Sequence, residues 1–203
     1  MEHIQKFENN PILELVKPLA KLTLLFFVIL FVQFQIFAIN NDELKPNIIV
    51  SADGKGDVKT VSEAIAKVPD NNKKRFTIFI KAGIYDEQIR IPVNKPFISL
   101  IGEDAKTTKL QFNISNKMAG STSAAYAFYV GGHSFVAENL TFENTFGQGS
   151  QAVAVVAEAD RITFKKCRFI GWQDTLYAKG GRQFYQDCYI EGHVDFIFGQ
   201  ASA

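Results

Sequence analysis

The sequence predicts an all-β fold, a parallel β-helix with one short helix near its N-terminal end. Short β-rich runs follow one another from residue 76 onward, and Gly, Asn or Asp ends most of them. No second long helical pattern is present, which excludes an alternating βαβ fold and leaves a sandwich, a barrel or a solenoid. A 21-residue repeat near the C-terminal end favours the solenoid, because each coil of a β-helix is one repeat unit.

Two stretches carry the repeat, CRFIGWQD (167–174) and CYIEGHVD (188–195). Both contain Cys, three residues, Gly, two residues and Asp, and the offset between them is 21 throughout. The match continues beyond them, since Leu176 maps to Ile197. Because equivalent positions of a solenoid stack on the next coil, we expect apolar pairs of this kind to form interior ladders. An earlier unit, NLTFEN (139–144), precedes the first stretch at a larger offset of 28, so its coil should contain a longer loop.

The elements expected before the repeat are one helix and a series of strands. Thr60 and Glu63 form a capping-box pattern ahead of an apolar run, which predicts a helix over 61–68. The glycines of DGKGD (53–57) predict a tight turn, because a phosphate-binding loop needs a longer glycine spacing that ends in Lys-Ser/Thr. The expected strands are FTIFIKAG (76–83), IRIP (89–92), FISLIG (97–102), KLQF (109–112), AFYVGG (127–132), FVAENLTFEN (135–144), AVAVVAE (152–158), ITFKKCRFIG (162–171) and RQFYQDCYIEG (182–192).

The N-terminal segment has the pattern of a secretory signal peptide. Residues 22–38 contain no charged side chain, three lysines precede them, and Ala38 is suited to a cleavage site. The run is short for a membrane span. We interpret residues 1–38 as a signal peptide, 39–45 as a linker and 46–203 as one domain. An uncleaved anchor and a core helix are the alternatives for the apolar run.

Composition narrows the class of partner. The net charge is +1 and the isoelectric point is about 7.7, whereas a nucleic-acid-binding domain usually has a strong excess of basic residues. The secretory route permits disulfides, and two glycosylation triplets, at Asn113 and Asn139, fit that route. The two cysteines, Cys167 and Cys188, either pair or pack as small buried residues, and the sequence leaves both open.

Asp174 and Asp195 end the two repeated stretches. Parallel strands on neighbouring coils lie about 4.8 Å apart, so the constant offset should bring the two carboxylates together. Two carboxylates at that separation cannot both ionise freely, so the pKa of one should rise. This arrangement suits one general acid beside one base or nucleophile. The alternative is that both residues only mark turns, where Asp is common.

The same region resembles the plant pectin methylesterase family. GWQDTLYAKGGRQFYQDCYIEGHVDFIFG (171–199) is similar to its central region, in which a Gln-Asp-Thr-Leu-Tyr block precedes an Asp-Phe-Ile-Phe-Gly block by one coil. SADGKGDVKTVSEAIAKVP, AGIYDEQIRIP and FVAENLTFENTFGQGSQAVAV resemble three further segments, so the similarity covers about residues 46–200. The resemblance implies a right-handed parallel β-helix that hydrolyses galacturonate methyl esters in pectin (homogalacturonan) and releases methanol, with no metal or cofactor.

The resemblance also implies a role for each matching position. Asp195 would be the nucleophile that attacks the ester carbonyl. Asp174 would protonate the leaving methoxide and then act as the base that activates water. Gln173 and Gln151 would donate hydrogen bonds to the developing oxyanion, a task that suits neutral amides. Three aromatic residues would form the walls of the sugar subsites: Trp172, Tyr177 and Phe198.

The implied setting is a monomer secreted to the cell wall. Its partners would be pectin and proteinaceous pectinesterase inhibitors, with no nucleic acid and no membrane once the signal peptide is removed. A Leu-Gly-Arg-Pro-Trp block of the family has no counterpart here, so we expect a β-helix that is truncated after Ala203 and incomplete at its C-terminal end. His193, two residues before Asp195, is expected to be a coil-edge residue.

Two alternative functions remain at this stage. A β-helix polysaccharide hydrolase would also use paired carboxylates, and a lyase often needs Ca²⁺ and a basic residue. Methanol release without chain cleavage would distinguish the esterase from both. A catalytically inactive pectin-binding or decoy protein would bind pectin and release no methanol.

Overall fold

The computed structural model describes residues 23–29, 31 and 45–203. The chain divides into two compact units, Met1–Lys45 and Pro46–Ala203. In the first unit, residues 23–29 and 31 are helical. Throughout the described part of the chain, every helix falls short of the length and hydropathy needed to cross a membrane. Most of the expected signal peptide and nearly all of the expected linker lie outside the described residues.

The second unit is a parallel β-helix built from three sheets in which every strand pairing is parallel. Sheet A contains β1 (Ile48–Val50), β2 (Phe76–Ile80), β5 (Ile98–Gly102), β8 (Val136–Glu138), β11 (Ile162–Lys165) and β14 (Gln183–Gln186). Sheet B contains β3 (Gly83–Asp86), β6 (Thr108–Phe112), β9 (Thr141–Asn144), β12 (Arg168–Ile170) and β15 (Tyr189–Glu191). Sheet C contains β4 (Ile89–Ile91), β7 (Tyr126–Val130), β10 (Val153–Ala157), β13 (Leu176–Ala178) and β16 (Ile197–Gly199).

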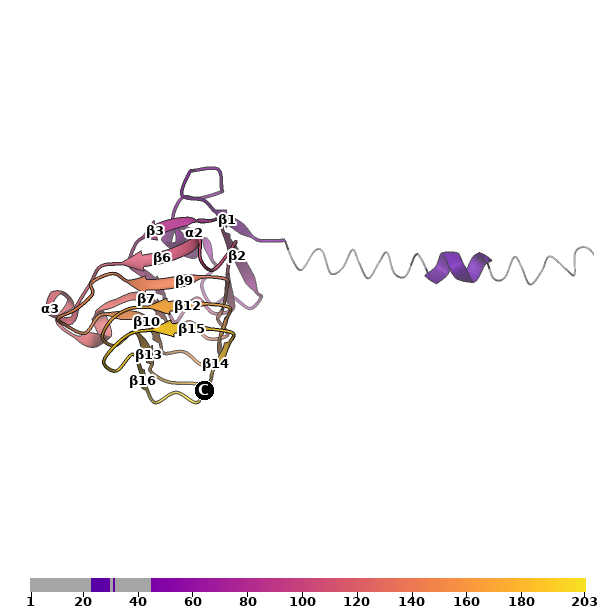
Figure 1. Ribbon diagram of the computed structural model, residues 1–203. Coiled ribbons are helices and arrows are strands. Elements are labelled where there is room, and N and C mark those ends of the chain that lie inside the picture. The colour runs from indigo at the N-terminus through magenta and orange to yellow at the C-terminus, as the bar shows by residue number, and fades with distance from the viewer. Residues whose placement is uncertain (1–22, 30, 32–44) are drawn as a thin grey trace, which may run out of the picture. The chain divides into compact units, whose positions relative to one another are not determined.

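Successive coils add one strand to each sheet in turn, so the strands of one sheet lie above one another. Figure 1 shows this for β3, β6, β9, β12 and β15, which follow one another along the stack. The predicted parallel β-helix is therefore confirmed. The predicted offset of 21 is confirmed in all three sheets, since Ile162 pairs with Gln183, Phe169 with Ile190 and Leu176 with Ile197.

The earlier repeat unit is shifted by one position from its predicted alignment. Phe142 pairs with Phe169, so the offset is 27 and not the 28 inferred from matching position 139 to Cys167. The additional residues of this coil lie between β9 and β10, in segment 145–152. The expected longer loop is therefore present, and the register is set by the apolar ladder.

Phenylalanine rings fill the interior between the three sheets. Phe142 lies 4.7 Å from Phe128 and 5.7 Å from Phe169, measured between ring centroids. Phe164 contacts Phe169 and Tyr185 at 5.0 and 5.3 Å. Four of these five side chains are at most 1% exposed, and Tyr185 is partly buried. Aromatic pairs of this kind contribute beyond their buried area, so stacked rings tie each coil to the next.

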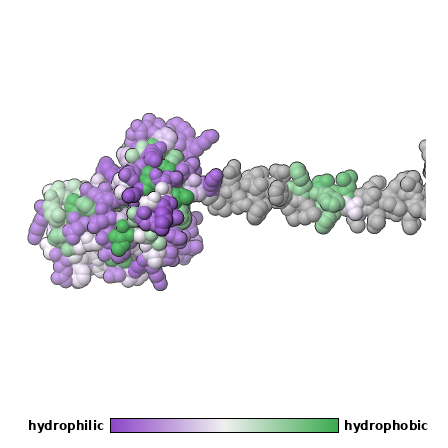
Figure 2. Space-filling model, turned by 90° about the horizontal axis from the view of Figure 1, so that it is seen from above, coloured by the Kyte–Doolittle hydropathy of each residue, from purple (hydrophilic) through white to green (hydrophobic). Residues whose placement is uncertain are grey.

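Helix α2 (Val61–Lys67) confirms the predicted helix and ends one residue earlier than expected. The capping box is formed, because the Glu63 N–H donates to Thr60 Oγ1 and the Thr60 N–H donates to Glu63 Oε2, both at 3.2 Å. The apolar side chains of Val61, Ala64 and Ile65 form the buried face of α2. Figure 2 views the second unit from above and shows mainly hydrophilic residues, interrupted by smaller hydrophobic patches.

Three predicted strands are each two strands in the structure. The runs 135–144, 162–171 and 182–192 are divided at Asn139, Lys166 and Asp187, whose φ angles are 55°, 49° and 54°. A residue in the left-handed region turns the chain sharply and moves it from one sheet to the next. Four short strands, β1, β3, β13 and β16, were not expected, nor were helix α3 (Asn116–Ala119) and the 3₁₀ turn η1 (Thr122–Ala124).

Candidate active site

Asp174 and Asp195 occupy equivalent positions on neighbouring coils. Asp174 lies between β12 and β13, and Asp195 lies between β15 and β16. The strands on both sides of them are paired at the same offset of 21. The Asp174 N–H donates to the carbonyl of Val194 at 3.1 Å, which joins the two turns directly. The structure thus brings the two predicted catalytic carboxylates together.

Both aspartates also define the turns in which they lie. Their φ angles are +66° for Asp174 and +50° for Asp195, in the left-handed region that Asp and Asn tolerate better than most residues. The alternative drawn from the sequence, that these residues mark turns, is therefore correct as a description of the backbone. It does not exclude a chemical role, because the same conformation fixes where each carboxylate is held.

The glycines of the repeat permit close packing of these turns. A Cβ on Gly171 would lie 2.7 Å from Thr175 Oγ1, and one on Gly192 would lie 2.4 Å from the same atom. Thr175 is fully buried, and its hydroxyl donates to the Glu191 carbonyl at 3.0 Å. One threonine therefore occupies the space that both glycines leave open. Sequence reasoning missed Thr175, although it directly follows the first aspartate.

Asp174 lies in an environment that favours its neutral form. Its side chain is only 7% exposed, whereas Asp195 is exposed. Burial raises the pKa of Asp174 above its ordinary value, and the negative charge of Asp195 raises it further. Within residues 45–203, no hydrogen bond to either carboxylate is present to oppose this effect. Both effects favour the protonated form of Asp174.

The two glutamines lie on neighbouring coils beside the aspartates. The Ala152 N–H donates to the Gln173 carbonyl at 3.0 Å, which places Gln151 and Gln173 on adjacent coils. Gln151 Oε1 accepts a hydrogen bond from Asn116 Nδ2 at 3.2 Å, and the Asn116 N–H donates to the Gln151 carbonyl at 2.8 Å. Because its oxygen is held in this way, the amide N–H₂ of Gln151 remains available as a donor. Asn116 has no sequence signal that could have identified it.

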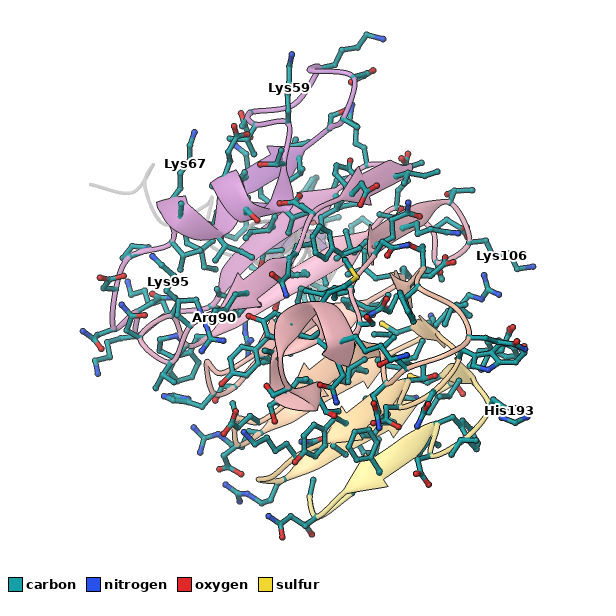
Figure 3. The ribbon with its side chains drawn as sticks, turned by 90° about the vertical axis from the view of Figure 1, so that its left-hand side faces the viewer. Lys59, Lys67, Arg90, Lys95, Lys106 and His193 are labelled. Carbon is teal, nitrogen blue, oxygen red and sulfur yellow. The ribbon has the colours of Figure 1, made fainter. Side chains whose placement is uncertain are left out.

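The aromatic candidates form two stacked pairs. The rings of Tyr177 and Phe198 lie 4.3 Å apart at 15°, on the outer side of sheet C. Trp172 stacks on His193 at 5.4 Å and 5°, and Trp172 is 37% exposed. The predicted coil-edge position of His193 is confirmed by Figure 3, where the labelled side chain projects at the edge of the molecule. Among the described residues, no three His, Cys, Asp or Glu side chains gather as ligands for a metal ion.

The cysteines lie in the interior and on its margin, away from these side chains. Both are free thiols; Cys167 is buried and Cys188 is partly buried. Burial raises the pKa of Cys167 to about 12, so this thiol is a poor nucleophile. Of the two possibilities left open by the sequence, the structure has both residues packed against the hydrophobic core.

Comparisons with known proteins agree on one family. The family model described as Pectinesterase matches residues 47–203. A pectinesterase from Petunia integrifolia is 48% identical over 160 residues, which cover 78% of this chain and 43% of that protein. The solved pectin methylesterase from carrot is similar with a TM-score of 0.76 and 40% identity, over 77% of this chain and 50% of that one.

A second similar structure contains a bound sugar. It is a pectin methylesterase with a single Asp-to-Ala substitution in complex with a hexasaccharide, matched with a TM-score of 0.69 and 32% identity over 77% of this chain and 52% of that one. The chain thus spans about half the length of these three proteins.

Proposed function

Because the chain belongs to the pectinesterase family, we propose that it hydrolyses the methyl esters of galacturonate units in pectin, with Asp195 as nucleophile and Asp174 as acid and base. The observation that carries the proposal is the in-register carboxylate pair. Asp174 is buried and its pKa is raised, and Asp195 is exposed to an incoming substrate.

In the first step, a carboxylate oxygen of Asp195 attacks the ester carbonyl carbon. The C–O bond to the methoxy group breaks, and Asp174 gives its proton to the leaving oxygen, so methanol departs. The products at this stage are a galacturonyl–Asp195 anhydride and an ionised Asp174. The raised pKa of Asp174 supports this order, because the acid must be protonated when the leaving group departs.

In the second step, Asp174 acts as the base. It removes a proton from water, and the resulting hydroxide attacks the galacturonyl carbonyl of the anhydride. The bond to Asp195 breaks, which restores the nucleophile as a carboxylate and the proton to Asp174. The sugar unit leaves as a carboxylic acid, which then loses its proton to the solvent. Atoms and charge balance over the cycle, and no metal or organic cofactor takes part in it.

Side chains around the pair supply binding and charge stabilisation. We assign Gln173 and Gln151 as donors to the oxyanion that forms in each step, since both flank the pair and Gln151 is oriented by Asn116. The ring pairs Tyr177–Phe198 and Trp172–His193 are suited to apolar sugar faces.

The proposed organisation follows the sequence expectations. Residues 1–38 would direct secretion to the cell wall, 39–45 would link the segments, and 46–203 would form the catalytic domain or a part of it. Pectin is the proposed partner, and pectinesterase inhibitor proteins are a second one. Some similar proteins carry pectinesterase/pectinesterase inhibitor in their names, which supports a link between the two activities. We propose that the protein acts as a monomer.

The test is methanol release from highly methyl-esterified pectin by the purified protein and by its Asp195→Asn variant. We expect methanol without a fall in pectin chain length, and a loss of at least about 10³-fold in the variant, because the nucleophile is removed. The matched control is Asp187→Asn. Asp187 shares the left-handed backbone conformation (φ 54°) on an exposed turn of the same coil, and it should retain activity.

Two results would overturn the proposal. Pectin chain cleavage would indicate a hydrolase or a lyase. Pectin binding with no methanol release, unchanged by Asp195→Asn, would indicate a binding or decoy protein.

A further inference from the structure

The outer side of sheet C carries a row of large side chains that extends well beyond the carboxylate pair. Arg90 on β4 pairs in register with Tyr129 on β7, and Tyr177 on β13 pairs with Phe198 on β16. Val156 on β10 connects the two halves, since it pairs with both Tyr129 and Tyr177. The row thus crosses five neighbouring strands, from Arg90 at one end to the stacked ring pair beside the active site at the other.

Arg90 holds an exposed positive charge at the far end of this row. Its guanidinium carbon lies 3.9 Å from the centroid of the Tyr129 ring, and one N–H donates to the Tyr126 hydroxyl at 3.3 Å. No carboxylate of the described residues lies within 4.0 Å of Arg90, in contrast to Arg182, which is paired with Asp160. A cation fixed over an aromatic ring keeps its remaining N–H groups directed elsewhere, ready for an anion.

The negative charge of Glu158, the acidic side chain in this network, is already balanced by a lysine. The Tyr129 hydroxyl donates to Glu158 Oε2 at 2.8 Å, and Lys179 Nζ lies 2.9 Å from Glu158 Oε1. Lys179 holds the pKa of Glu158 below its ordinary value, so this carboxyl group is ionised and balances the lysine charge. The positive charge of Arg90 is therefore not balanced by an ion pair with any described carboxylate.

The separation along the row sets the size of the ligand. Arg90 and Tyr177 lie on strands three positions apart, or about 14 Å at about 4.8 Å per strand. That distance is too long for the sugar unit under attack to reach Arg90 itself. A polysaccharide chain can reach both, with one unit at the aspartates and another unit at Arg90.

We propose that Arg90 binds the carboxylate of an unesterified galacturonate unit on a pectin chain whose methyl-esterified unit lies at Asp174 and Asp195. The inference rests on the proposed function, because that reaction converts neutral esters into the anions that Arg90 would recognise. Each hydrolysed unit would then improve binding of the same chain for a further cycle. Guanidinium groups suit this role, since their planar N–H groups match the geometry of a carboxylate.

The experiment measures binding by isothermal titration of the purified full chain, with Asp195→Asn present throughout so that the esterified oligomer is not hydrolysed during the measurement. The ligands are two galacturonate oligomers of equal length, one unesterified and one fully methyl-esterified. For Arg90→Gln we expect about a 10-fold loss of affinity for the unesterified oligomer, as for loss of one charge-assisted contact, and less than about a 2-fold change for the esterified one. Arg90→Lys should recover part of the lost affinity, because it keeps the charge and loses the planar geometry.

The matched control is Lys106→Gln, which removes one positive charge from an exposed position. Figure 3 shows Lys106 at the right-hand edge of the β-helix and Arg90 in its left half, so the two side chains lie well apart in this view. The control should bind both oligomers as the unchanged protein does. An equal loss in Lys106→Gln would attribute the effect to net charge and overturn the proposal. An equal loss for both oligomers in Arg90→Gln would do so too, because it would assign Arg90 to packing of Tyr129.

The outcomes separate this inference from the proposed function. If the protein releases methanol and Arg90→Gln binds both oligomers normally, the inference fails and the esterase function stands. If neither oligomer binds the unchanged protein, the inference fails as well, and the methanol assay decides independently whether the esterase function is correct.

Discussion

The coils from β10 to β16 have a constant length, whereas those from β4 to β10 are longer and vary in length. From β10 onward the offset between paired strands is constant at 21, so Val155, Leu176 and Ile197 follow one another at an even spacing. Before β10, the offset is 39 from Ile89 to Phe128 and 27 from Phe128 to Val155. The uniform coils align the two carboxylates that we propose as catalytic, whereas the longer coils contain α3, η1 and the 145–152 loop.

This difference shows which positions are set by coil length and which depend on specific side-chain contacts. Two carboxylates can be placed on each other by a constant coil length alone, with no dedicated contact between them. The longer coils need specific side-chain contacts to hold their loops, such as the bond from Asn116 to Gln151. Stability in the uniform region should therefore depend on the ring stack, and in the irregular region on individual polar contacts.

The largest effect should come from Phe164→Ala in the uniform region. Phe164 contacts Phe135, Phe142, Phe169 and Tyr185, and it is fully buried. Loss of this ring should lower the free energy of unfolding by about 3–5 kcal/mol, through lost burial and the cavity that remains. Urea unfolding followed by circular dichroism measures it. Phe184→Ala, at a position 56% exposed, is the control, and a similar loss there would contradict the stack as the source of stability.

A smaller effect is expected from Glu87→Ala, which lies just before β4 and so immediately ahead of the irregular coils. The Glu87 carboxylate accepts hydrogen bonds from the backbone N–H groups of Val61 and Ser62, at 2.7 and 3.0 Å, and so caps the first turn of α2. Its removal should cost about 1–2 kcal/mol, because two N–H groups at a helix N-terminus lose their partner. Thermal unfolding provides the measurement. Asp86→Ala, the exposed neighbour, should change stability by less than about 0.5 kcal/mol; equal effects would show that α2 does not depend on this cap.

The smallest effect concerns the pH dependence that Asp174 gives to the uniform region. Its folded pKa is raised, by burial first and by Asp195 second. Its contribution to stability is therefore fully present below the ordinary pKa of an unfolded aspartate, about 3.9, and is lost as pH rises through the higher folded pKa. Asp174→Asn should accordingly raise the melting temperature at pH 7 and have little effect near pH 3. We expect this gain to be the smallest of the three effects.

Asn is a suitable replacement at this position, since it tolerates the left-handed backbone. Asp187→Asn gives the baseline for losing a carboxylate at an exposed position with the same conformation. A gain that is as large at pH 3 as at pH 7 would count against ionisation of Asp174 as its cause.

Features that repeat along the chain, or that depend only on neighbouring residues, could be predicted from the sequence. The capping box of Thr60 and Glu63 predicted α2 to within one residue. The spacing between Asp174 and Asp195 predicted their alignment, because residues separated by a constant offset lie above one another on neighbouring coils of a parallel β-helix.

Features that depend on backbone conformation or on distant partners could not be predicted in this way. The change of sheet at Lys166 carries no signal, because lysine has no preference for the left-handed region. Thr175 and Asn116 act through partners that are distant along the chain, Glu191 and Gln151. Arg90 lies in an ordinary strand pattern, and only the register that places it beside Tyr129 shows its part in the outer row.

The pairing of each strand with its neighbours in the stack also has a consequence for how the chain acquires its structure. Among the described strands, the largest offset between partners is 39, from Ile89 to Phe128, and the offset of the repeat is 21. No strand pair has to wait for a partner from the opposite end of the sequence. The β-helix can therefore form vectorially during synthesis, with each completed coil serving as a template for the one that follows.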